Sequence, residues 1–117
     1  MTATNPVLRH AAVMLERAGK KQNARIWKEA SSLLSGPTSN RVEVNLGRIS
    51  RIVEDGGVVF VPGKVLGTGV MGRKVTVGAF AFSDAARSKI EASGGSALTI
   101  VEFLKKYPKG SGVKLVK

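Results

Sequence analysis

The chain has 117 residues, of which 43% are apolar, so we expect a single domain over residues 1–117 with a hydrophobic core rather than a disordered chain. It has no cysteine and one histidine, which excludes disulfide scaffolds, cysteine-ligated zinc, thiol nucleophiles and metal-holding histidine clusters. Its 19 Lys and Arg exceed its eight Asp and Glu, and the net charge of +11 favours a polyanionic partner, nucleic acid before an acidic membrane surface.

The first third of the chain predicts two helices. Asn5 and Pro6 offer an N-cap followed by proline at the first helical position. Apolar residues then recur at three- and four-residue spacing as far as Gly19, which is a helix stop signal. The same spacing predicts a second helix over about residues 22–34. We therefore expect an antiparallel helical arm over residues 1–36, with its connection at residues 18–21.

Short strands and helices alternate after residue 39, which predicts a mixed α/β core over residues 40–117 with a basic C-terminal end. Asn45, Ser83 and Thr99 are candidate helix caps, and Glu102 completes a capping-box pattern with Thr99. Pro62-Gly63 is expected to end a strand. The predicted strands are 42–44, 58–61, 64–66, 75–79 and 113–115, and the predicted helices begin at residues 46, 84 and 100.

The sequence predicts no membrane segment. No run of apolar residues approaches the roughly 20 that a spanning helix needs. Arg9 and His10 interrupt the N-terminal apolar run that a secretory signal requires. We therefore expect a chain that stays in the cytoplasm.

The positive charge is concentrated in three blocks. Residues 1–30 carry +4, residues 64–82 carry +3 and residues 105–117 carry +5, whereas residues 31–63 are neutral and residues 83–104 carry −1. A phosphate backbone explains such clustering, because each Lys or Arg that neutralises a phosphate releases a condensed counterion. The arm, the glycine-rich stretch and the tail are therefore the expected contact regions.

The spacing of Lys21, Arg25 and Lys28 puts them on one face of the second predicted helix. A merely solvated face is the alternative interpretation. Glu29 is the only acidic residue in this helix, whereas an ordinary surface helix mixes both signs. The imbalance favours a phosphate-binding face.

Residues 67–72 match the GxGxxG pattern of dinucleotide-binding loops. That fingerprint must open a helix, whereas a strand is predicted to follow here. A Walker A loop would need Lys and then Ser or Thr after its last glycine, and the chain has Arg73 and Lys74. Residues 69–72 also match the GxxG pattern of a KH domain. That loop joins two helices, whereas this one is predicted to join two strands, which argues against a KH domain. We therefore expect a glycine-rich loop whose backbone approaches a phosphate, with Arg73 and Lys74 beside it.

No catalytic set can be proposed from the sequence. His10 stands alone on the first predicted helix, and Ser83-Asp84 is typical of a helix start. We expect no enzymatic activity, no metal, no cofactor and no small-molecule substrate. Most aromatic residues fall on apolar faces, so we expect them in the core and not stacked on bases.

Several segments resemble one protein family. They are residues 42–49 (VEVNLGRI), 61–69 (VPGKVLGTG), 74–77 (KVTV) and, in 82–90, Phe82, Ser83, Ala86, Lys89 and Ile90. These segments are similar to the eighteen-e family of large-subunit ribosomal proteins in its archaeal form, which is related to bacterial large-subunit ribosomal protein fifteen.

The resemblance implies a fold and a role. The implied fold is an irregular stack of strand-strand-helix units with the helical arm alongside. The implied role is that of a structural ribosomal protein in the cytoplasm, which binds large-subunit ribosomal RNA and touches neighbouring large-subunit proteins.

The resemblance also implies that Arg48 and Lys64 contact RNA. The alternatives are an ion pair of Arg48 with Glu43 or Glu54, and an exposed turn lysine at Lys64. Six other candidates rest on charge clustering alone: Lys20, Lys21, Arg25, Lys28, Arg73 and Lys74. For Lys114 and Lys117, the alternative is a terminal lysine that is merely solvated. The full set of candidate RNA-binding residues is Lys20, Lys21, Arg25, Lys28, Arg41, Arg48, Lys64, Arg73, Lys74, Lys114 and Lys117.

Two other functions remain open at this point. One is a basic DNA-binding or chromatin protein that uses the helical arm as a helix-turn-helix. The other is an enzyme that grips a nucleotide with residues 67–72. The second predicted helix offers mainly Lys and Arg, which suits phosphates better than base edges.

Overall fold

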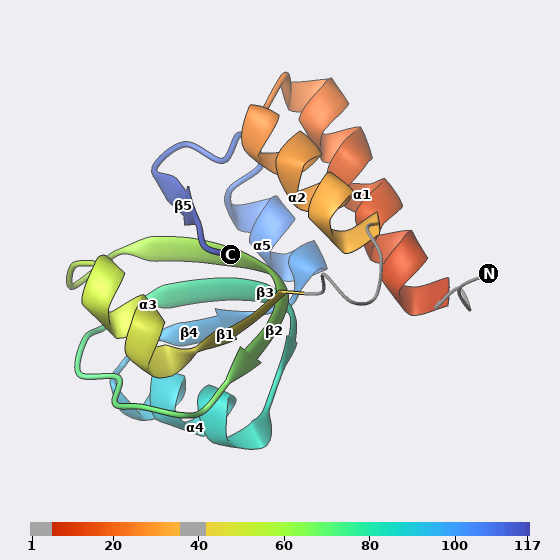
Figure 1. The fold of residues 1–117 in the computed structure, drawn as a ribbon. Helices are drawn as coiled ribbons and strands as arrows, with labels where there is room; N and C mark the ends of the chain where they lie inside the picture. The colour runs from red at the N-terminus through yellow and green to blue at the C-terminus, as the bar shows by residue number, and fades with distance from the viewer. Residues whose placement is uncertain (1–5, 36–41) are drawn as a thin grey trace.

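The computed structural model describes residues 6–35 and 42–117 (Figure 1). These residues form a parallel sheet with helices on both faces and a helical hairpin at the N-terminus, which confirms the predicted α/β class. The helices are α1 Pro6–Gln22, α2 Arg25–Ser35, α3 Leu46–Ile52, α4 Asp84–Ala92 and α5 Ile100–Lys106. The strands are β1 Val42–Asn45, β2 Val58–Leu66, β3 Thr76–Phe82, β4 Ser96–Leu98 and β5 Val113–Leu115.

The strand and helix units join in one five-stranded sheet whose strand pairs are all parallel. Its order is β1-β2-β3-β4, and β5 pairs with β2. Because β3 occupies one edge of β2, β5 and β1 share the other edge. There, β5 pairs with Val58–Phe60 and β1 pairs with Gly63–Leu66.

The prediction that β2 ends at Pro62-Gly63 is wrong. The strand continues to Leu66, with a register shift against β3 between Val61 and Lys64. Proline lacks a backbone N–H and is tolerated in sheets at such irregularities. Pro62 also falls where the neighbour of β2 changes from β5 to β1.

The strands alternate between two cores, one on each face of the sheet. Val59 and Val61 of β2, with Val77 of β3, pack under α3 and α4. Phe60 points to the opposite face, where the hairpin and α5 cover the sheet (Figure 1). The short β4 precedes α5 and was not predicted, because three residues after a Gly-Gly turn give no alternation to detect.

An aromatic cluster fastens the hairpin to the sheet. Trp27 of α2, Phe60 of β2 and Phe103 of α5 are fully buried, with ring centroids 5.2–5.8 Å apart. The indole Nε1 of Trp27 donates to the Pro108 carbonyl at 2.9 Å. The ring of Phe103 lies against the backbone of Gly78, where a Cβ atom would come within 2.3 Å of it. These contacts confirm that the largest aromatic side chains are core residues.

The predicted hairpin forms, but its helix boundary is different. Helix α1 runs through Gly19 to Gln22, and the connection lies at residues 23–24, where Asn23 has a φ of 51°. Gly19 marks the close contact between the two helices, since a Cβ there would lie 2.7 Å from Lys28 Cγ. The predicted cap at Asn5 lies outside the described residues.

The helix caps of the core follow the sequence prediction in part. The Ser83 hydroxyl accepts from the Ala86 N–H, and Thr99 and Glu102 form the full capping box. Asn45 occupies the N-cap position of α3, but its side chain makes no capping hydrogen bond. In the described part of the chain, no helix has the length and apolar character needed to cross a membrane.

Candidate nucleic-acid interface

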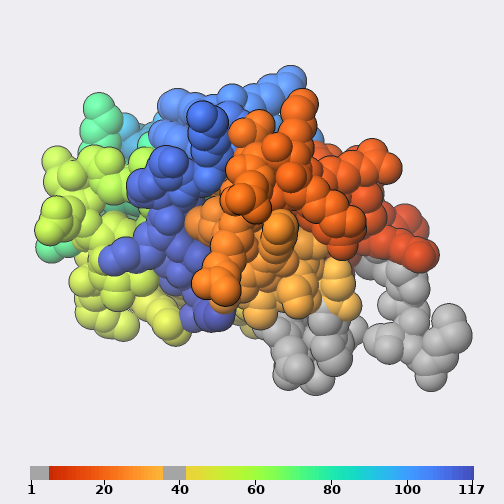
Figure 2. All heavy atoms as spheres, turned by 90° about the horizontal axis from the view of Figure 1, so that it is seen from above, coloured from red at the N-terminus to blue at the C-terminus, as the bar shows by residue number. Residues whose placement is uncertain are grey.

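The fold brings two of the three basic blocks together. The loop between α5 and β5 lies beside the tip of the hairpin, where α1 ends and α2 begins (Figure 1). Besides the Trp27–Pro108 hydrogen bond, Gly110 packs on Ile26, and Lys117 Nζ lies 2.5 Å from Glu29 Oε2. Seen from above, the hairpin and the C-terminal segment form one continuous face (Figure 2).

We call the exposed basic residues of this face the hairpin–tail surface. It consists of Lys20, Lys21, Arg25, Lys28 and Lys109. Lys109 was not among the predicted site residues. The only signal for it in the sequence is its position in the C-terminal block of five lysines.

The prediction that Lys21, Arg25 and Lys28 share one helical face is wrong, because Lys21 belongs to the last turn of α1 and the other two to the start of α2. All three nevertheless lie within four residues of the connection at residues 23–24, which forms the hairpin tip. Over residues 6–35 and 42–117, the ion pairs are Lys20–Glu16 at 3.6 Å and Lys117–Glu29. Lys21, Arg25 and Lys28 therefore have no carboxylate partner there.

Electrostatics make the start of α2 unusual. A helix N-terminus carries partial positive charge and favours acidic side chains. The first turn of α2 contains no acid, and Arg25 and Lys28 add full positive charges there. Lys21, at the end of α1, adds to the same region. This concentration of charge disfavours the isolated fold locally, and a bound anion would relieve it.

Two of the predicted RNA-binding residues instead donate hydrogen bonds to backbone carbonyls at the C-terminal end of α3. The Arg73 guanidinium donates to the Val53 carbonyl, and Lys114 Nζ donates to the Ile52 carbonyl at 3.1 Å. The last carbonyls of a helix lack partners within it, and cations there also match the helix dipole. These contacts give Arg73 and Lys114 a structural role. The Lys74 side chain is exposed, and its backbone N–H donates to Asp55 Oδ1 at 2.7 Å.

Two glycines of the glycine-rich loop pack closely against the protein, although Val70 between them and Gly72 is exposed. Gly67 packs against Ala85 of α4 and Gly69 against Gly47 of α3, both too closely for a side chain. The carbonyls of Gly67 and Gly69 accept hydrogen bonds from Lys89 Nζ at 2.6 and 2.9 Å. Strand β3 follows this loop, as expected, so it lacks the helix that a dinucleotide fingerprint needs.

Arg48 and Lys64 are both exposed, on α3 and β2 respectively. Arg48 is paired with neither Glu43 nor Glu54, since the ion pairs found in the described ranges lie elsewhere. Lys64 belongs to the strand and not to a turn. Arg41 lies outside the described residues.

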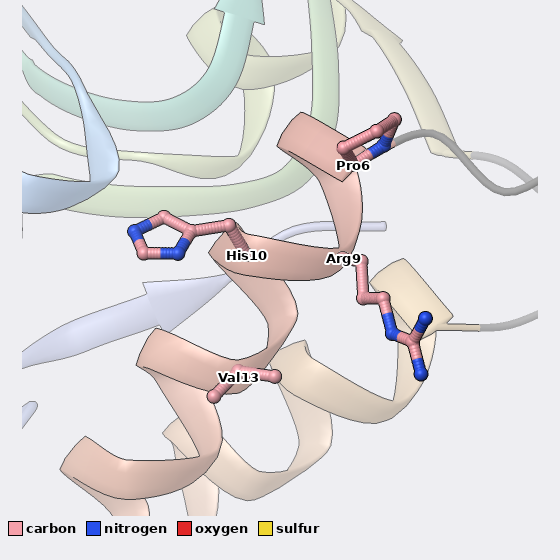
Figure 3. A pocket seen from close by; sticks show the side chains of 4 residues that line it. All are labelled: Pro6, Arg9, His10 and Val13. Carbon is pink, nitrogen blue, oxygen red and sulfur yellow. The ribbon is translucent and has the colours of Figure 1, made fainter.

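A shallow hollow on α1 is lined by Pro6, Arg9, His10 and Val13 (Figure 3). Arg9 and His10 point in opposite directions, so they do not form a pair (Figure 3). His10 is exposed, as expected. No group of three His, Asp or Glu side chains spaced for a metal ion occurs in the part of the chain that the structure describes.

Comparison with known proteins identifies the family. The model of a family described as ribosomal proteins 50S-L15 and 50S-L18e, together with a 60S member, matches residues 38–98. A protein of Methanococcus maripaludis named large ribosomal subunit protein eL18 is 44% identical over 114 residues, which cover 97% of this chain and 95% of that protein. Proteins of the same name from Methanoregula boonei and Pyrobaculum aerophilum are each 41% identical over 97% of this chain and 94% and 93% of their own length. The chain therefore belongs to the ribosomal protein family that includes 50S-L15 and 50S-L18e.

Proposed function

We propose that this chain is a structural constituent of the large ribosomal subunit in the cytoplasm, where it binds folded ribosomal RNA through basic patches on the phosphate backbone. Family membership and the net charge of +11 support the proposal. As a member of a family of ribosomal proteins, the chain acts as a structural component and not as an enzyme. Neighbouring large-subunit proteins are its other partners.

The hairpin–tail surface is the observation that carries the RNA-binding proposal. It joins cations from the arm and the tail, and it includes the positive end of the α2 dipole. The phosphates of the RNA backbone neutralise the cations of the arm, the cations of the tail and the partial positive charge of the α2 N-terminus. The counterions released from the RNA drive binding. Contacts of this kind recognise the shape of folded RNA and carry little sequence information.

The site residues divide into two groups under this proposal. The residues of the hairpin–tail surface bind phosphates at the hairpin tip: Lys20, Lys21, Arg25, Lys28 and Lys109. Lys117 lies near the same face because it pairs with Glu29 of α2. The remaining candidates, of which Arg73 and Lys114 also cap α3, form further contacts on the core. The members of this second group are Arg41, Arg48, Lys64, Arg73, Lys74 and Lys114.

Charge reversal at the hairpin tip tests the proposal. The full chain with Lys20→Glu, Lys21→Glu and Arg25→Glu should lose most of its affinity for purified large-subunit ribosomal RNA. The slope of log K against log salt should become shallower by about 2–3, roughly one for each lost phosphate contact.

The control variant carries the same change in charge elsewhere. Arg9→Glu, Arg87→Glu and Lys105→Glu remove three exposed cations outside the hairpin tip, and this variant should retain far more of the RNA affinity. Undiminished RNA binding by the hairpin-tip variant would remove the hairpin from the site.

Competition with duplex DNA at matched salt tests the alternative of a DNA-binding protein. A recognition helix must protrude to enter the major groove. Helix α2 is instead held between α1 and the sheet by Trp27 and by the Ser31 hydroxyl, which donates to the Ala12 carbonyl at 2.6 Å. Structured RNA should therefore outcompete duplex DNA, and the reverse order would favour the DNA-binding function.

A further inference from the structure

A polar groove of about 350 Å³ lies at the carboxyl ends of β1 and β2. Helix α3 forms one wall, and the connection between β2 and β3 forms the other; the two run beside each other in Figure 1. Ligands of open parallel sheets bind in crevices at this end of the strands. The polar residues that line the groove are Glu43, Asn45, Arg48, Arg51 and Thr68.

The walls of the groove are held together by backbone contacts. The Gly47 N–H donates to the Thr68 carbonyl at 3.1 Å. Gly69 has a φ of 100°, and a Cβ there would lie 2.6 Å from Gly47 Cα, so the loop and α3 touch through their main chains. Lys89 braces the loop from the other side through its two carbonyl contacts. The groove is therefore formed before any ligand binds.

Two arginines give the groove affinity for an anion. Arg48 and Arg51 lie one turn apart on α3, are exposed, and take part in none of the ion pairs of residues 6–35 and 42–117. Arginine binds phosphate with two parallel hydrogen bonds and also stacks on bases. The Asn45 amide makes no capping bond, so its donor and acceptor are available to a ligand.

The carboxylate of Glu43 makes the groove more suitable for a nucleotide than for a free phosphate. A carboxylate in the same groove repels a free phosphate, but it accepts hydrogen bonds from base N–H groups. Guanine offers N1–H and N2–H side by side, whereas uracil flanks its single N–H with two carbonyl acceptors. The combination of two arginines and one carboxylate therefore fits a nucleotide whose base presents adjacent donors.

We propose that this groove holds one unpaired guanosine nucleotide of the bound RNA, with a phosphate on Arg48 and Arg51 and the base edge on Glu43. The proposal rests on the proposed function and adds a base-specific contact to the phosphate contacts of the hairpin–tail surface. Unpaired nucleotides are the elements of folded RNA that proteins read by sequence.

Fluorescence anisotropy of the full chain with labelled oligouridines tests the proposal. The oligonucleotides have about eight nucleotides and carry a single G, C, A or U at the centre. The wild-type chain should bind the central G roughly tenfold more tightly than U. Glu43→Gln should abolish this preference without weakening binding to the all-U strand, and Arg48→Ala with Arg51→Ala should weaken binding to all four.

Two further variants test whether the preference for G depends on the shape of the groove and not on the total charge of the protein. Thr68→Leu narrows the groove without a change in charge and should reduce the preference for G. Lys105→Ala with Lys106→Ala removes the same charge as the two arginine changes from the last turn of α5 and should keep the preference. Circular dichroism checks that each variant is folded.

The outcomes separate this proposal from the proposed function. A wild-type chain that binds the four strands equally, or none of them, overturns the groove proposal, as does a Glu43→Gln variant that still prefers G. Binding to intact large-subunit ribosomal RNA is measured in parallel. Loss of that binding on reversal of the hairpin tip supports the proposed function, whatever the groove variants do.

Discussion

Gly78→Ala should destabilise the protein, because Gly78 is the point where α5 sits on the sheet. An added Cβ would lie 2.3 Å from Cδ2 and 2.5 Å from Cγ of Phe103. Carbon atoms in ordinary contact are about 3.5–4.0 Å apart, so the ring would have to move by about 1 Å. Phe103 is fully buried against Trp27 and Phe60, which leaves it no free space.

The magnitude follows from these contacts. Overpacking of a buried site lowers the free energy of unfolding by about 1–3 kcal/mol. Replacement of a glycine within a strand by alanine raises it by about 0.5–1 kcal/mol, because glycine loses more conformational freedom on folding. The difference between these two ranges is about 0–2.5 kcal/mol, and the close overlap with Phe103 favours the upper part of it, so the free energy of unfolding should fall by about 1–2 kcal/mol. For a domain of this size, that corresponds to a decrease in Tm of roughly 4–10 °C.

Thermal and urea unfolding of the full chain measure the effect. Gly72→Ala is the matched control, because a Cβ at Gly72 meets no heavy atom within 4 Å, and its stability should stay within about 0.5 kcal/mol of the wild type. Phe103→Leu removes the ring, so the double variant with Gly78→Ala should lose less than the sum of the single losses. A Gly78→Ala variant as stable as Gly72→Ala would refute this account of how α5 packs on the sheet.

Three further predictions concern single contacts. Trp27→Phe keeps a buried ring but loses the hydrogen bond to Pro108, so unfolding measurements should show a loss of about 1–2 kcal/mol. Amide hydrogen exchange at residues 109–112 should accelerate, and unchanged exchange would contradict this role of Trp27. Lys89→Met should lower Tm and loosen residues 67–70 in hydrogen exchange, because two loop carbonyls lose their donor; an unaltered loop would argue against this role. Thr99→Ala should cost about 1 kcal/mol through the lost cap. The backbone N–H and then the hydroxyl of Thr99 hold the pKa of Glu102 below its usual value, so the stabilisation is present above the unfolded pKa of this carboxyl and is lost as the pH falls through the lowered value. NMR titration of Glu102 should show its pKa rising in Thr99→Ala, and an unchanged pKa would refute the contribution of the hydroxyl.

Local patterns in the sequence were sufficient to predict much of the fold. The capping box at Thr99 and the Ser83 cap give the starts of α5 and α4, because each depends on residues within one turn. Alternating and continuous apolar runs give the positions of β1, β3 and β5. The errors in the predicted element boundaries arise where tertiary contacts determine how far a helix or strand continues. Gly19 continues a helix because α2 packs against it, and β2 passes Pro62 because a different strand pairs with it on each side.

The candidate site depends more heavily on distant contacts. The sequence identified the basic arm and the basic tail, but their adjacency results from the Trp27–Pro108 bond and the Lys117–Glu29 pair, which join residues more than 80 positions apart. Charge alone also could not separate Arg73, which caps α3, from Lys21, which has no carboxylate partner among the described residues. Arg51 was missed, although its spacing of three from Arg48 was visible.

Sedimentation of a lysate of the source cells through a sucrose gradient, after a moderate-salt wash, tests the central claim most directly. The wild-type chain should sediment with the large ribosomal subunit in stoichiometric amount, and the variant with reversed charges at Lys20, Lys21 and Arg25 should be depleted from that fraction. A wild-type chain that stays at the top of the gradient, or that follows chromosomal DNA, would contradict the account.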